Sequence, residues 1–144
     1  MTDDSTDTST DPAGSAQAAP GRVGVLASIS LDCTDPARLA EFYGRLLGLA
    51  RVFTSPDGGV VALSDGGVAL TLMRTDDHVR PTWPQPGQQQ QMHLDVSVVD
   101  LDDAVARAVA LGAVEAGHQA AADRWRVLLD PAGHPFCLTT VTGG

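Results

Sequence analysis

One pattern occurs twice in this chain, and it constrains the fold more than any single motif does. In residues 23–74 an alternating apolar and polar segment is followed by an aspartate, a helix-prone segment and three strand-like segments. The same order returns in residues 91–141. Because a duplicated unit of about 50 to 60 residues buries its apolar faces against its copy, one fold built from two such units is expected.

The first copy has clear boundaries. Residues 23–33 alternate with a period of two, which predicts a strand. Asp35 and Pro36 are typical of a helix start, and Gly48 is typical of a helix end. Strands separated by glycine-containing turns are then expected at residues 49–54, 60–63 and 68–74.

The second copy begins at a histidine. Residues 93–98 predict a strand, Asp100 and Asp103 are spaced as in a capping box, and Gly112 ends the expected helix. The remaining strands are expected within residues 113–123, at 124–129 and at 135–141.

The two copies differ at equivalent positions. When the cap aspartates are superposed, Ser28 of the first copy corresponds to His93 of the second. When the turn glycines near residues 67 and 133 are superposed, Thr71 corresponds to Cys137. Of these four side chains, only the histidine and the cysteine of the second copy are competent metal ligands.

Residues 22–144 are therefore expected to form a single α+β domain, with modules 22–75 and 91–142 joined by a polar linker, residues 76–90. Residues 1–21 have no large apolar side chain after Met1 and carry four aspartates without a base. Such a segment cannot bury enough surface to offset its ordering entropy, so it is predicted to be a disordered acidic tail.

Charge excludes some partners. The net charge is −9, and the nine positive side chains are scattered arginines, without a basic cluster. An acidic surface gains nothing from counterion release, so neither nucleic acid nor an anionic membrane is expected as a partner. The start lacks a basic segment followed by an apolar one, and no apolar run approaches a membrane span, so a cytoplasmic protein is expected. Cys33 and Cys137 show no CxxC spacing and are expected to be free thiols.

Three segments carry a resemblance to a known family. They are Asp35-Pro36 through Leu47-Gly48, His93 through Asp102, and the run Asp130-Pro131-Ala132-Gly133-His134-Pro135. Together with the duplicated unit, they resemble the vicinal oxygen chelate superfamily, which includes glyoxalases, bleomycin-resistance proteins and extradiol dioxygenases. The Trp83-Pro84 connector and the run before His93 further resemble its actinobacterial glyoxalase-like subgroup.

That resemblance implies an open, curved, eight-stranded mixed sheet around a cleft, with both helices outside, and a homodimer. It also implies that the metalloenzyme ligand positions fall on Ser28, Thr71, His93 and Cys137. Because serine and threonine are poor ligands, no bound metal and no cofactor are expected.

Each candidate site residue has two possible interpretations, one functional and one structural. His93 is either a cleft-facing base or ligand contact, or a hydrogen-bonded histidine that closes the sheet. Cys137 is either a nucleophile beside His93 or a small buried hydrophobe. Asp95 is either an acid–base carboxylate, paired with Asp32, or a solvated strand residue. Met73, Trp83 and Trp125 either form a stacking wall for a planar ligand or pack in the core or a dimer.

Three functions remain open at this point, and with them the question of whether the protein is an enzyme. The first is binding of a small hydrophobic or aromatic molecule without a metal. The second is a metal-independent lyase or isomerase that uses His93. The third is a divalent-metal-dependent enzyme of the glyoxalase or dioxygenase type.

Overall fold

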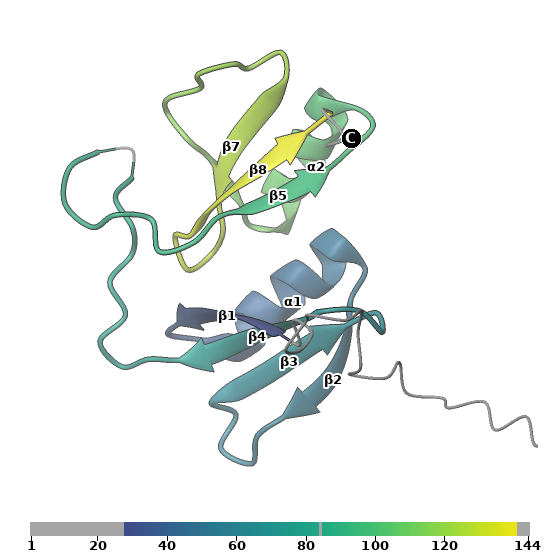
Figure 1. The fold of residues 1–144 in the computed structure, drawn as a ribbon, viewed down its shortest axis with the longest axis vertical. Helices are drawn as coiled ribbons and strands as arrows, with labels where there is room; N and C mark the ends of the chain where they lie inside the picture. Colours follow the sequence, from purple (N-terminus) through teal and green to yellow (C-terminus); the bar gives the residue numbers. More distant parts are fainter. Residues whose placement is uncertain (1–27, 84, 141–144) are drawn as a thin grey trace, which may run out of the picture.

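The computed structural model describes residues 28–83 and 85–140, so the expectation for the 1–21 tail lies outside the described residues. The observed order of elements is the predicted βαβββ order, repeated (Figure 1). The first module contains β1 (Ser28–Cys33), α1 (Pro36–Leu47), β2 (Ala50–Thr54), β3 (Val60–Ser64) and β4 (Ala69–Arg74). The second contains β5 (Leu94–Ser97), α2 (Leu101–Leu111), β6 (Val114–Glu115), β7 (Trp125–Leu129) and β8 (Pro135–Thr139).

Both helices begin and end where their capping residues predict. The Asp35 carboxylate accepts a hydrogen bond from the Arg38 backbone N–H at 3.2 Å, and Pro36 occupies the first turn of α1. The Asp100 carboxylate accepts the equivalent bond from Asp103 at 2.9 Å. Each helix ends at a glycine in the left-handed region, where a side chain would be strained. The helices are 12 and 11 residues long, and no helix among the described residues is long and apolar enough to cross a membrane.

The strands form two four-stranded sheets with the same topology. Their orders are β1-β4-β3-β2 and β5-β8-β7-β6, and in each the first and last strands of the module pair in parallel. Ser30 pairs with Thr71 in the first sheet, and Asp95 pairs with Cys137 in the second. These pairs occupy equivalent ladder positions, which confirms the alignment of the two copies and the predicted α+β class.

The relation between the modules differs in one respect from the sequence-based picture of one eight-stranded sheet with its helices outside. Among the described residues no hydrogen-bonded ladder joins the two sheets, and α1 contacts α2. Figure 1 shows α1 between the first sheet and the second module. The ring of Phe42 on α1 lies 5.9 Å from that of Phe136 on β8, and one buried apolar cluster spans both modules. Both helices and the inner faces of both sheets contribute to this one core, so the outer faces of the sheets are left for other contacts.

A buried polar cluster fixes the turn between β7 and β8 against the first module. The Tyr43 hydroxyl donates to the Asp130 carboxylate at 2.6 Å, and the backbone N–H groups of Ala132 and His134 donate to its other oxygen. His134 is buried and donates from Nε2 to the Asp32 carbonyl. Burial, together with the neighbouring Asp130, raises the pKa of Tyr43 well above its ordinary value. The hydroxyl therefore stays protonated and remains a donor.

Candidate functional site

The candidate site is a pocket of about 870 Å³ on the face of the second sheet that is turned away from the core. Its floor comes from alternate residues of three adjacent strands, because side chains two apart share one face of a sheet. The linker and the loop between β6 and β7 complete it. The lining residues are Trp83, His93, Asp95, His118, Ala120, Arg124, Trp125, Val127, Cys137 and Thr139.

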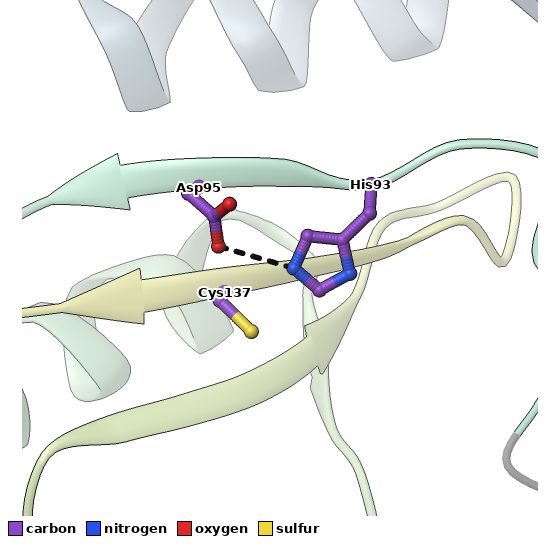
Figure 2. Close-up of side chains that lie close together, drawn as sticks. All are labelled: His93, Asp95 and Cys137. Carbon is purple, nitrogen blue, oxygen red and sulfur yellow. Dashed lines mark hydrogen bonds and ion pairs between the residues drawn. The ribbon is translucent and has the colours of Figure 1, made fainter. Parts of the chain in front are cut away.

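His93 and Asp95 form the polar end of the floor. His93 directly precedes β5 and Asp95 is its second residue, so both side chains reach the same face, and His93 Nε2 lies 3.2 Å from Asp95 Oδ1. Figure 2 shows the ring and the carboxylate directed toward each other, with Cys137 on the adjacent strand beneath them. A histidine whose ring is oriented by a carboxylate is a suitable base or hydrogen-bond partner for a ligand.

Cys137 is a buried thiol beside this pair. Burial, and to a lesser extent the negative charge of Asp95, raises its pKa from 9.0 to about 11. The thiol is therefore protonated at neutral pH, which is the opposite of what an activated nucleophile needs. Its burial and its raised pKa favour Cys137 as a small apolar residue of the pocket floor over Cys137 as a nucleophile.

The same three residues could hold a metal ion. One ligand atom from each of His93, Asp95 and Cys137 lies within 4.8 Å of the other two. A nitrogen, a carboxylate oxygen and a sulfur, with room for a fourth ligand, fit the donor set of a zinc-type ion. Sequence reasoning counted only His93 and Cys137, because it sought the other donors in the first module and overlooked a carboxylate two residues along the same strand.

The apolar walls of the pocket are aromatic. Trp83 from the linker and Trp125 from β7 both line it, so two of the three residues expected in a stacking wall are brought together. The guanidinium carbon of Arg124 lies 4.8 Å from the centroid of the Trp125 ring, a cation–π contact.

Three expected site residues are placed elsewhere, on the outer face of the first sheet. The Ser28 and Thr71 hydroxyls are hydrogen-bonded to each other at 2.6 Å. Met73 lies on the same face and is 39% exposed. None of the three lines the pocket on the second sheet. The expectation assumed that both modules of one chain face a common cleft, whereas here the helices, not the outer sheet faces, bring the modules together.

Sequence reasoning missed several lining residues, above all Arg124 and His118. His118 lies in a stretch without periodicity, where no pattern assigns a direction to a side chain. Arg124 could have been found, because it directly precedes a tryptophan at the start of a predicted strand. It is the only arginine among the lining residues.

Comparison with known proteins agrees with this architecture. A family model described as a glyoxalase-like domain matches residues 28–139. No curated protein matches the chain significantly in sequence. Several solved structures share the fold.

A fosfomycin resistance protein FosX from Mesorhizobium loti is similar, with a TM-score of 0.64 and 16% identity over 84% of this chain and 94% of its own. A glyoxalase-related enzyme from Fulvimarina pelagi has a TM-score of 0.59 and 22% identity over 80% and 86%. FosX from Listeria monocytogenes, in a complex with Mn(II) and a dihydroxypropylphosphonic acid, has a TM-score of 0.61 and 17% identity over 84% and 92%.

Proposed function

This chain belongs to the family of glyoxalase-like domains, within the vicinal oxygen chelate superfamily, and we propose that it binds a small, planar aromatic or hydrophobic molecule in the pocket of its second sheet without requiring a metal. Trp83 and Trp125 would cover the faces of such a ligand, and His93 with Asp95 would bind a polar group at its edge. Cys137 would be part of the floor.

The proposal rests on one observation: the pocket has the volume of a small-molecule site and is lined by aromatic residues. The volume of about 870 Å³ lies within the range of small-molecule sites, and the lining combines two tryptophans with few polar groups. The polar groups, with His93 and Asp95 on one side of the pocket and Arg124 on the other, would orient a ligand, while the aromatic surface would supply most of the binding free energy.

We further propose a homodimer that works in the cytoplasm. Ser28, Thr71, Met73 and the 53%-exposed Phe53 share the outer face of the first sheet, because their strands pair in register. An exposed face that is partly apolar is suited to a contact with another protein. If this face covers the pocket of a second copy, the hydroxyls of Ser28 and Thr71 would reach the ligand from the partner. Light scattering at micromolar concentration should give twice the chain mass; a monomeric mass would refute this part.

The binding proposal is tested by calorimetric titration with planar aromatic compounds. Saturable binding should weaken about tenfold or more in Trp125→Ala, because base-like rings stacked on tryptophan contribute roughly 1–3 kcal/mol each. Val109→Ala, an exposed change on α2, is the control and should bind like the parent. Equal affinities for the parent and Trp125→Ala would refute the assignment of the pocket.

Proton-transfer catalysis without a metal is a second candidate, and the 3.2 Å contact between His93 and Asp95 favours it. In that case His93→Gln should abolish turnover of a substrate while the far-UV circular dichroism spectrum is retained. Turnover that survives the substitution would exclude His93 as the base.

A metal-dependent enzyme is the third candidate, favoured by the donors of His93, Asp95 and Cys137 and by the Mn(II) complex of the structurally similar FosX. A bound ion would supply Lewis-acid chemistry, with His93, Asp95 and Cys137 as its ligands, and the Cys137 thiol would give up its proton on binding. Loading with Zn²⁺, Mn²⁺ or Fe²⁺ should then leave close to one ion per chain, and Asp95→Asn should reduce this amount. Less than about 0.1 ion per chain would exclude a site of ordinary affinity.

A further inference from the structure

We propose that the ligand of the pocket is an aromatic monocarboxylate, whose negative charge is bound by Arg124 while its ring lies between the tryptophans. This inference rests on the proposed binding function and specifies its ligand class. Three observations support it. The Arg124 guanidinium has no acidic partner among the described residues, Asp95 lies on the other side of the pocket, and the guanidinium contacts one face of Trp125.

The backbone of Arg124 is held in place while its guanidinium remains available. Its carbonyl accepts hydrogen bonds from the Thr140 N–H and the Thr139 hydroxyl, both at 3.4 Å. Among residues 28–83 and 85–140, its guanidinium forms no ion pair and no hydrogen bond, and its contact is the face of Trp125. Arginine is usually placed near a carboxylate or phosphate because its planar fork binds them in a bidentate manner.

Arg126, two residues along the chain, provides an internal contrast. Its guanidinium is bonded to the carboxylates of Asp102 and Glu115, each at 3.0 Å, and to a backbone carbonyl at 2.6 Å. These contacts join β7 to α2 and β6, so Arg126 serves the fold. Within the part of the chain that the structure describes, Arg124 has no such carboxylate partner; it lines the pocket, which leaves its charge for a ligand.

The negative group that lines the pocket lies away from Arg124. Asp95 is on β5 and Arg124 directly precedes β7, with β8 between these strands. Two strand spacings separate the strands by about 10 Å. Asp95 is also hydrogen-bonded to His93. An anionic group at the Arg124 end is therefore attracted by the guanidinium without direct repulsion by the carboxylate.

A cationic ligand fits less well, although tryptophan pockets commonly bind cations. One face of Trp125 already contacts a guanidinium, whose positive charge would repel a cationic ligand. A dianion, such as a phosphonate, fits less well too, because one arginine supplies a single fixed positive charge in a chain of net charge −9. Within about 870 Å³ there is room for one or two fused rings with a carboxylate.

The test compares three probes of equal shape on the full chain: 2-naphthoate, the neutral 2-naphthamide and the cationic 2-naphthylmethylammonium. The carboxylate should bind about tenfold more tightly than the amide, because a hydrogen bond between two ionised groups is stronger than one to a neutral amide. Arg124→Gln should abolish this difference between the carboxylate and amide affinities. Arg107→Gln removes the same charge from the exposed face of α2 and should preserve the difference.

Each outcome has one meaning. Equal affinities for the carboxylate and the amide, tighter binding of the ammonium, or a preference that persists in Arg124→Gln would overturn the carboxylate inference while leaving aromatic binding intact. Failure of all three probes to bind would overturn the proposed function and this inference together.

Discussion

The two modules have the same backbone plan and opposite side-chain chemistry at equivalent positions. In the first, Ser28 and Thr71 satisfy each other at 2.6 Å across a parallel strand pair. In the second, the equivalent pair is His93 and Cys137, joined by Asp95 where the first module has Ser30. A duplicated unit can thus keep its fold in both copies and concentrate a site in one, because the outer face of each sheet is not needed for the core.

The turns before the last strands provide a second contrast. Asp130 in the second module is buried and accepts hydrogen bonds from Tyr43 and from two backbone N–H groups. Asp65, in the corresponding turn of the first module, is exposed and accepts one bond from the Gly67 N–H at 3.0 Å. One turn joins the modules, and the other closes a hairpin at the surface.

Substitution of the buried turn aspartate should cost more stability than substitution of the exposed one. Asp130→Ala should lower the free energy of unfolding by at least about 3 kcal/mol, because it leaves three buried donors without an acceptor. Asp65→Ala should cost less than about 1 kcal/mol, since water replaces its carboxylate. Urea denaturation of both variants gives the comparison. Similar losses in the two variants would show that the buried cluster does not hold the modules together.

The two buried thiols should react slowly with alkylating reagents. Burial raises the pKa of Cys33 and of Cys137 alike, from 9.0 to about 11. Since only the thiolate reacts, iodoacetamide should alkylate Cys137 in a Cys33→Ser background more than about tenfold more slowly than free cysteine near neutral pH. The rate should rise with pH up to about 11.

The sign of the linked stability follows from the same shift. The pKa of the Cys137 thiol is 9.0 in the unfolded chain and about 11 in the folded one. The free energy of unfolding should therefore fall as the pH rises from 9.0 toward about 11, because the unfolded chain loses its proton first. Rapid alkylation of Cys137 near neutral pH would contradict the raised pKa and support Cys137 as a nucleophile.

Substitutions at the equivalent positions 93 and 28 should change the ligand affinity by smaller and unequal factors. His93→Ser makes the second module resemble the first and should weaken aromatic ligand binding about fivefold, through loss of one polar contact of roughly 1 kcal/mol. Ser28→Ala should change the affinity about twofold or less, because the Ser28 oxygen is already hydrogen-bonded to Thr71. A stronger effect of Ser28→Ala than of His93→Ser would place the main ligand contacts on the first sheet.

Most of the fold could be predicted from the sequence, because local chemistry determined it. Asp35, Gly48, Asp100 and Gly112 act through bonds within their own helix ends, and strand alternation directs side chains to alternate faces. The packing of the modules could not be predicted, since it depends on contacts distant in sequence, such as Tyr43 with Asp130. The site was found in part: alternation brought His93, Asp95 and Cys137 together, whereas Arg124 and His118 depend on loops.

A planar aromatic ligand bound on the second sheet, as we propose, would lie next to the tryptophans of the pocket. The chain has two tryptophans, Trp83 and Trp125, and both line that pocket. Intrinsic tryptophan emission therefore reports on this site alone. Titration with 2-naphthoate should change the emission saturably in the parent, and also in each of Trp83→Phe and Trp125→Phe, where one reporter remains. No saturable change in emission in any of the three proteins would contradict this proposal.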